Sequence, residues 1–284
     1  MLATLLLLMV LAGLLAGVVM CVTYGVCRKL DNFGIVDAVW AAGFTLIVAL
    51  YFTWMARAFW NPVSGGFGRW NWPPAAMLCA MVTVWSLRLA GHLAVRIRAH
   101  HPGEDVRYAR LRQEWGPDTN RRMFGFFQLQ GALQVVLSLP FALVHLRFDA
   151  ASSAGDWRPG WTELCGLGLW LAGLIGESLA DRQLARFRAD PARRGQVCQD
   201  GLWRYSRHPN YFFEWLIWLG YAVYALGSPL GWLAFLSPLL MWHFLVNVTG
   251  IPMTEELSVK SKGDAYREYQ RTTHAFVPWF RRGA

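Results

Sequence analysis

Apolar stretches long enough to cross a lipid bilayer recur along this chain, and they limit its possible folds more than any other feature. A membrane-spanning helix needs roughly 20 apolar residues. Of the 284 residues, 55% are hydrophobic and only 16% are charged, which is typical of a multi-pass membrane protein. The expected spans are residues 3–27, 35–59, 73–97, 124–147, 161–182, 210–227 and 229–250. We therefore expect an all-α protein with seven transmembrane helices in a single domain, residues 1–284, whose cofactor-binding half covers approximately 96–284.

The first apolar stretch is better explained as a transmembrane helix than as a signal peptide. It has no basic residues before it, it is longer than the apolar part of a signal peptide, and no small-residue cleavage site follows it. The five cysteines are scattered without paired spacing. This pattern predicts neither a zinc site nor a disulfide framework.

Basic residues are concentrated in alternate segments between the spans. Most of the 27 Lys and Arg residues lie in residues 28–29, 96–122, 182–207 and 260–282. The positive-inside rule then predicts an external N-terminus and a cytosolic C-terminus. The last three of these segments could together form a cationic opening for a ligand with several phosphates. Nucleic acid is a poor alternative partner because no nucleic-acid-binding module is present, and no glycine-rich Rossmann fingerprint is found.

The segment Arg204–Glu214 joins a polar cluster to the start of an apolar span. Pro209 suits the first turn of a helix, and Asn210 and Glu214 then lie one turn apart. An amide and a carboxylate so placed could bind a primary carboxamide such as that of nicotinamide. Alternatively, Asn210 caps the helix and Glu214 pairs with Arg88 or His243.

A second stripe of ionisable residues lies at the end of the span 161–182. Glu177, Asp181 and Arg188 are separated by four and seven residues, so they share one helical face. The carboxylates there could accept hydrogen bonds from ribose hydroxyls, and the arginine could bind phosphate. The alternative is a ladder of ion pairs where a helix leaves the membrane.

Other polar groups within spans allow two interpretations. Asp37 lies near the start of an apolar stretch. Apolar surroundings favour the protonated form of a carboxyl, which could donate a hydrogen bond to a carbonyl group. The alternative is an Asp37 that is accessible to water. Arg88, His92 and Arg96 share one stripe of the third span, and His243 and Asn247 share one face of the last. These residues could simply form hydrogen bonds between helices.

The C-terminal tail predicts an amphipathic helix followed by aromatic residues. It could anchor on the membrane surface or fold over the cationic opening as a lid, and the sequence does not decide between these.

Several of these motifs resemble those of the bacterial steroid 5α-reductase-like family. The segments that carry the resemblance, over roughly residues 30–280, are Asp37-Ala-Val-Trp40, Trp85-Ser-Leu-Arg-Leu89, Gly103-Glu-Asp-Val-Arg-Tyr108, Asp181-Arg-Gln183, Arg207-His-Pro-Asn-Tyr211 and the pattern Tyr266-x-x-Tyr-x-x-x-Thr-x-x-Phe-x-Pro. The resemblance implies a seven-helix fold in the bacterial inner membrane, with NADPH bound on the cytosolic side. It also implies reduction of the C=C bond of a 3-oxo-Δ4 steroid or similar enone lipid, which would enter from the bilayer between the first four helices.

The resemblance also implies roles for individual residues. Asn210 and Glu214 match the nicotinamide contacts, and Asp181 and Arg188 match the ribose and phosphate contacts. Further cofactor contacts are implied at Arg98, Tyr108, Glu177, Arg207 and His208, although Glu177 stands where the eukaryotic enzymes have an amide. Asp37 takes the place of a catalytic glutamate that hydrogen-bonds the substrate ketone. Trp85 aligns with a catalytic tyrosine but cannot supply a proton, so Tyr24 or His92 could replace it, or the substrate differs.

Two other function classes remain as alternatives. Arg-His-Pro-x-Tyr with the downstream pair Glu255 and Glu256 is similar to membrane methyltransferases that use S-adenosylmethionine and act on isoprenylcysteine or phospholipid. Glu214, the Asp181 stripe and the many arginines favour the reductase, since S-adenosylmethionine has no phosphate. A lipid or sterol carrier would not need the cationic opening.

Overall fold

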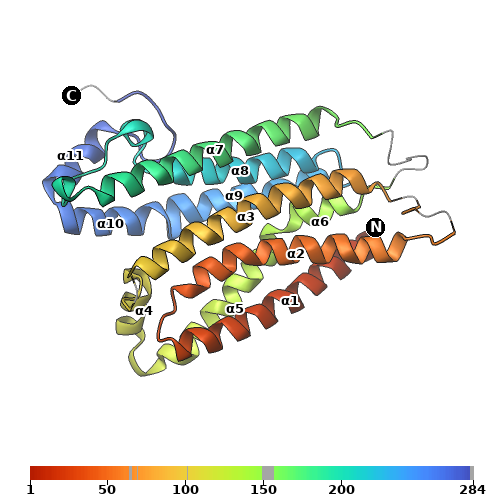
Figure 1. The fold of residues 1–284 in the computed structure, drawn as a ribbon, viewed down its shortest axis with the longest axis horizontal. Coiled ribbons are helices and arrows are strands. Elements are labelled where there is room, and N and C mark those ends of the chain that lie inside the picture. Colours follow the sequence, from red (N-terminus) through yellow and green to blue (C-terminus); the bar gives the residue numbers. More distant parts are fainter. Residues whose placement is uncertain (64–65, 69, 101, 149–156, 282–284) are drawn as a thin grey trace. The chain divides into compact units, whose positions relative to one another are not determined.

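The computed structural model describes residues 1–63, 66–68, 70–100, 102–148 and 157–281, and this part of the chain is helical (Figure 1). Within it, strand-like pairing is limited to isolated bridges such as that between Ser206 and His274. The helices are α1 (Leu2–Lys29), α2 (Ile35–Phe59), α3 (Trp72–His100), α4 (Val106–Trp115), α5 (Thr119–Leu137), α6 (Leu139–His145), α7 (Trp161–Ala189), α8 (Pro209–Ala225), α9 (Leu236–His243), α10 (Ile251–Lys262) and α11 (Asp264–Thr272). The all-α prediction is confirmed for the described residues.

The chain forms two compact units. The first comprises Met1–Pro159 with Gly227–Leu233, and the second comprises Gly160–Leu226 with Ala234–Ala284. The predicted single domain over residues 1–284 is not tested by this grouping and stays a prediction.

In the first unit, polar groups fix the short turn between α1 and α2. The side-chain oxygen of Asn32 accepts a hydrogen bond from the backbone N–H of Gly34 at 3.0 Å. The backbone N–H of Phe33 donates to Glu104 at 2.6 Å. Phe33 itself is buried against Tyr108 and other apolar residues of α1 and α5. The turn therefore holds the start of α2, where Asp37 lies, close to the residues that precede α4.

A bend separates α5 from α6. The two helices meet at an angle of 41° at Ser138, just before Pro140. Proline has no backbone N–H and its ring opposes a continuous helix. The hydroxyls of Ser138 and Tyr51 lie 2.9 Å apart, so the break also has a polar partner.

In the second unit, glycines bring α7 and α8 into close contact. A Cβ atom on Gly173 would lie only 2.8 Å from the carbonyl oxygen of Phe213, and one on Gly220 only 2.7 Å from the backbone nitrogen of Trp170. Small residues at such crossings allow helix backbones to approach closely, as in many membrane helix pairs. This packing places the polar stripe of α7 beside the first turns of α8.

The described residues contain five helices long and apolar enough to cross a membrane, or six if the bent α5–α6 pair counts as one span. The expectation of seven is therefore supported only in part. The expected span that is not among them is α8, which is too short. Its 17 residues extend about 26 Å at roughly 1.5 Å per residue, and the turn signal at residues 227–229 follows its end. The last span is also longer than expected, covering Gly231–Lys262 with a π-helical segment at Phe244–Val248.

Candidate functional site

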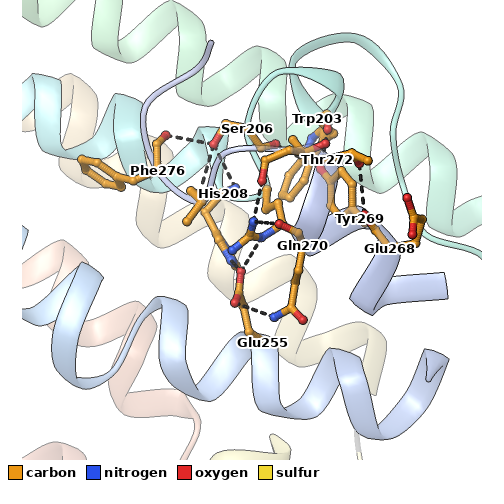
Figure 2. A network of polar contacts seen from close by, with 12 residues as sticks. Trp203, Ser206, His208, Glu255, Glu268, Tyr269, Gln270, Thr272 and Phe276 are labelled. Carbon is orange, nitrogen blue, oxygen red and sulfur yellow. Dashed lines mark hydrogen bonds and ion pairs between the residues drawn. The ribbon is translucent and has the colours of Figure 1, made fainter. Parts of the chain in front are cut away.

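The Arg207-His-Pro motif lies in a buried polar cluster of the second unit, centred on Glu255 of α10 (Figure 2). Arg207 Nε donates to Glu255 Oε1 at 2.6 Å, and the His208 Nε2 atom lies 3.2 Å from the same oxygen. The side-chain amide of Gln270, on α11, donates to the other oxygen of Glu255 at 2.8 Å. We refer to Arg207, His208, Glu255 and Gln270 as the Glu255 cluster.

The Glu255 cluster is shielded from solvent. The side chains of Arg207 and Glu255 are 10% and 15% exposed, and that of His208 is 3% exposed. Arg207 also donates to the backbone carbonyls of Gln270 and Thr273. The guanidinium is thus held by one carboxylate and two carbonyls, as a buried charge requires.

Burial lowers the pKa of His208, although the hydrogen bond to Glu255 and the charge of that carboxylate oppose the shift. The ring of His208 stacks on that of Tyr211 at 5.3 Å between centroids. The hydroxyl of Tyr211 in turn lies 3.1 Å from that of Thr254 on α10. The start of α8 is therefore tied to α10 by two consecutive residues of the latter, Thr254 and Glu255.

The C-terminal tail is tied to the same motif. The backbone N–H of Arg207 donates to the carbonyl of His274 at 2.9 Å, and that of Trp279 donates to Tyr205 at 3.0 Å. The Ser206 hydroxyl donates to the carbonyl of Phe276 at 2.9 Å (Figure 2). These bonds fix the course of the tail, but they fit both of its predicted roles, lid and surface anchor.

A cavity of about 500 Å³ lies between the end of α7, the segment that follows it, and α10. Its polar wall on α10 consists of residues on one helical face, namely Thr254, Ser258, Ser261 and Lys262. Its apolar wall includes Leu184, Phe187 and Leu257. We call this the α7–α10 cavity, and its volume is typical of a site for a small ligand.

The α7–α10 cavity carries an excess of positive charge. Arg188, Arg193, Arg194 and Lys262 line it, together with a single carboxylate, Asp190. That carboxylate is matched by Arg193, which lies 3.4 Å from it and also pairs with Asp200. The described lining residues therefore carry a net positive charge, and such a set is suited to an anionic ligand.

The predicted nicotinamide and ribose contacts lie on α7 and α8 of the same unit. Glu177 and Glu214 are buried, at 4% and 8% exposed. Glu214 accepts a hydrogen bond from the indole of Trp218 at 3.0 Å. Asn210 and Asp181 are half-buried. The predicted partners Asn210, Glu214, Asp181 and Arg188 thus belong to one compact unit.

Asp37 and Tyr108 meet in the first unit. The Tyr108 hydroxyl donates to Asp37 Oδ1 at 2.6 Å, and Arg107 donates to Asp37 Oδ2 at 2.5 Å. Arg107 also bonds Asp105, whose pKa is lowered because hydrogen bonding and charge from Arg107 outweigh the effect of burial. The expectation of a carboxyl in an apolar surrounding is therefore modified, because Asp37 has a guanidinium beside it. Tyr108, predicted as a cofactor contact, lies against the predicted catalytic carboxylate.

The remaining predicted residues lie on α1, on α3 and on the last span. Trp85 is fully buried in α3 and packs against Phe44 with ring centroids 5.4 Å apart, while Arg98 is exposed on the same helix. The hydroxyl of Tyr24 donates to the carbonyl of Asn120 at 2.8 Å. His92 and Arg88 are half-buried on α3. On the last span, the side chains of Asn247 and His243 lie 3.5 Å apart, so the predicted shared face is confirmed.

Sequence reasoning missed the α10 side of the site. Thr254, Ser258 and Lys262 follow one another at four-residue intervals, so a helical stripe of donors was present in the sequence. It was not recognised because these residues follow the expected span 229–250 and were interpreted as part of the amphipathic C-terminal tail. Gln270, which bonds Glu255 from 15 residues away, left no comparable signal.

Comparison with known proteins gives a family and two relatives. The family model described as "Protein of unknown function (DUF1295)" matches residues 23–273. An uncharacterized protein of Schizosaccharomyces pombe is 28% identical over 225 residues, which are 71% of this chain and 62% of that protein. The 3-oxo-5-alpha-steroid 4-dehydrogenase 1 of Macaca fascicularis is 36% identical over 70 residues, 25% of this chain and 27% of the enzyme. Each match thus covers less than two thirds of the relative's length. No solved structure matches.

Proposed function

Since this chain belongs to the DUF1295 family of proteins of unknown function, and part of it is similar to a 3-oxo-5-alpha-steroid 4-dehydrogenase, we propose that it is a membrane reductase. Its reaction would be reduction of the C=C bond of a 3-oxo-Δ4 steroid or a similar enone lipid. The observation that carries the proposal is the positively charged α7–α10 cavity, in the same unit as Asn210 and Glu214.

NADPH fits the residues of the second unit. When bound, it would supply the hydride that is added to the β-carbon of the enone. Arg188 and the other cations of the α7–α10 cavity would hold its phosphates, and Asp181 would accept a hydrogen bond from a ribose hydroxyl. Asn210 and Glu214 have the donors and acceptors that a carboxamide needs, and Glu177 is a further buried acceptor in this unit.

The carbonyl end of the substrate would be served by Asp37 and Tyr108 of the first unit. Asp37 accepts hydrogen bonds from both Arg107 and Tyr108. The Tyr108 hydroxyl has a single hydrogen, which it gives to Asp37, so it would have to turn that hydrogen away from Asp37 to donate toward a developing enolate oxygen. Asp37 and Arg107 would position that hydroxyl. Protonation of the α-carbon, with a proton drawn from water, would complete the addition of two hydrogen atoms across the double bond.

The proposal includes a place in the cell. The concentration of basic residues in alternate segments predicts that the α7–α10 cavity faces the cytosol. The resemblance to the bacterial steroid 5α-reductase-like family implies the inner membrane of a bacterium, with the apolar substrate entering from the bilayer. The seven-span topology belongs to the same proposal.

Binding and turnover by the purified full-length protein in lipid nanodiscs test the proposed function. We expect NADPH to raise the melting temperature, S-adenosylmethionine to leave it unchanged, and a 3-oxo-Δ4 steroid to cause oxidation of NADPH. Stabilisation by S-adenosylmethionine alone would refute the reductase and support a methyltransferase. Sterol binding without NADPH oxidation would indicate a carrier.

A further inference from the structure

Two polar side chains lie on the exposed apolar face of the last span. His243 and Asn247 are exposed, as are Leu236 and Leu239 earlier in the span. Neighbours in this set are three or four residues apart, which is the spacing of one helical stripe. The span, Gly231–Lys262, is long and apolar enough to cross a membrane. His243 and Asn247, which we call the polar pair, therefore lie on a surface that would otherwise suit hydrocarbon alone.

The backbone that carries the polar pair is irregular. Residues Phe244–Val248 form a π-helical segment, and the backbone N–H of Thr249 donates to the carbonyl of Phe244, five residues earlier, at 2.9 Å. A Cβ atom on Gly250 would collide with the carbonyl oxygen of Leu245, so the turn depends on a glycine. Short π-helical segments inside helices are rare and frequently occur at functional sites. The irregularity and the polar pair thus coincide in one part of the span.

The polar pair satisfies its own hydrogen bonding only in part. Asn247 Nδ2 lies 3.5 Å from His243 Nδ1, and neither side chain has a further hydrogen-bond partner among the described residues. If the amide nitrogen donates to Nδ1 of a neutral imidazole, the pair still offers the Nε2 hydrogen and the amide oxygen. If the amide is turned round, the pair offers Nε2 as an acceptor and the amide hydrogens as donors. In either arrangement one donor and one acceptor remain.

A hydroxyl group matches this arrangement, because it donates one hydrogen bond and accepts another. Polar side chains within a membrane span normally face a cavity or a polar partner, since contact with hydrocarbon alone is costly. Leu236 and Leu239 would cover the apolar body of a ligand whose hydroxyl reaches the polar pair. A second copy of the chain fits less well. Helices that pair in membranes favour small residues at their contact, whereas this face has leucines and the exposed Trp242.

We infer that His243 and Asn247 bind the hydroxyl group of an apolar ligand that lies along the last span. The hydroxyl site is independent of the proposed function, but assigning its ligand as the enone substrate rests on that function. Such a substrate would carry a hydroxyl in addition to its enone. A membrane lipid with a free hydroxyl, such as a diacylglycerol, has the same chemistry, so the test separates the two sources.

The experiment measures binding of two matched pairs of probes to the full-length protein in phosphatidylcholine nanodiscs. One pair is a 3-oxo-Δ4 steroid with a hydroxyl on the ring farthest from the enone and its deoxy analogue. The other is dioleoylglycerol and its methyl ether. Affinities are expressed against the probe concentration in the lipid, because the members of each pair partition differently. Wild type should bind the hydroxyl member of at least one pair about ten-fold more tightly, as expected for two hydrogen bonds between neutral groups.

The variants assign this preference to the polar pair. Asn247→Leu and His243→Phe should each lower the affinity ratio about three-fold, and the double variant should bring it to about one. Apolar replacements suit a membrane span, and the melting temperature of each variant shows whether it folds. Thr249→Val is the matched control, because the Thr249 hydroxyl lies in the same segment and already contacts the carbonyl of Phe244 at 3.5 Å. It should leave the affinity ratio unchanged.

Preference within the steroid pair would support the site and assign it to the substrate, and preference within the glycerol pair alone would support it as a lipid site. Equal affinities within both pairs, or a preference that survives in the double variant, would overturn the inference. A dimer that Asn247→Leu converts to a monomer, without change in the affinity ratio, would overturn it in favour of a contact between copies.

The outcomes for the site and for the reductase are distinguishable. Enone-dependent oxidation of NADPH, with equal affinities within both probe pairs, would overturn the hydroxyl site and leave the reductase intact. Hydroxyl preference that depends on His243 and Asn247, without any oxidation of NADPH, would support the site and refute the reductase.

Discussion

Replacing Glu255 with alanine should strongly destabilise the second unit. The substitution removes the carboxylate that accepts hydrogen bonds from Arg207 at 2.6 Å and from Gln270 at 2.8 Å. Arg207, whose side chain is 10% exposed, then loses its carboxylate partner and keeps the carbonyls of Gln270 and Thr273 as acceptors. Breaking a buried ion pair by removing one member typically costs about 3–5 kcal/mol. Because two carbonyl acceptors remain, we expect a loss near the lower end, about 3 kcal/mol.

Glu256→Ala is the matched control for this effect. Glu256 is the next residue of α10 and pairs with Lys260 across one turn, but both side chains are largely exposed, at 44% and 66%. An exposed pair with this spacing contributes only about 0.3–0.5 kcal/mol. The two variants therefore remove the same charge from the same helix and differ in burial.

The assay is equilibrium unfolding of the full-length protein in mixed micelles, followed by tryptophan fluorescence and circular dichroism. A double-mutant cycle with Arg207→Met and Glu255→Leu adds a second readout, since removing both charges should restore part of the stability that each single change loses. If Glu255→Ala and Glu256→Ala destabilise the protein equally, the Glu255 cluster is not the stabilising element that we describe.

Three further predictions concern the α7–α8 contact, the first unit and His208. Gly173→Leu should destabilise the α7–α8 pair by about 3 kcal/mol through overpacking. Gly168→Ala should be tolerated, because a Cβ there meets nothing within 4 Å. Equal melting temperatures of the two variants would contradict this prediction. Tyr108→Phe should lower enone-dependent kcat roughly 100-fold while NADPH affinity is retained, and unchanged kcat would exclude this hydroxyl from the reaction. The pKa of His208 is lowered by burial, so the unfolded chain binds more protons below about pH 6.5 and the free energy of unfolding should fall as the pH decreases through that value. This part of the pH profile should be absent in His208→Asn.

The helical architecture followed from apolar length, but the exact spans did not. Stretches such as 3–27 and 35–59 lie within a few residues of α1 and α2, because a long apolar sequence has few alternatives to a helix. The bend at Ser138 and the π-helical segment after His243 depend on local backbone bonding and on neighbouring groups such as Tyr51. Hydropathy averages over such positions, so it placed one continuous span where the structure has a break.

Spacing along one helix predicted which side chains share a face, and it could not predict partners from distant segments. The stripe from Glu177 to Arg188 lies on α7 as expected. The hydrogen bond between Tyr108 and Asp37 joins residues 71 positions apart, and that between Arg207 and Glu255 joins residues 48 apart. Contacts of this kind are set by how helices pack, which a single sequence does not contain.

The geometry of α10 offers an explanation for why one motif could serve membrane enzymes with different cofactors. One face of α10 carries Glu255, which Arg207 and His208 hold, and a neighbouring face carries Ser258 and Lys262, which line the α7–α10 cavity. The motif therefore supports the wall of the cavity, while the residues that line the cavity lie on a neighbouring face of the same helix. Changing residues on the cavity face would alter which ligand binds without disturbing the support beneath it. Transplanting the cavity-facing residues of α10 should therefore change cofactor preference, whereas the Arg207–Glu255 pair should be required for folding whichever cofactor is bound.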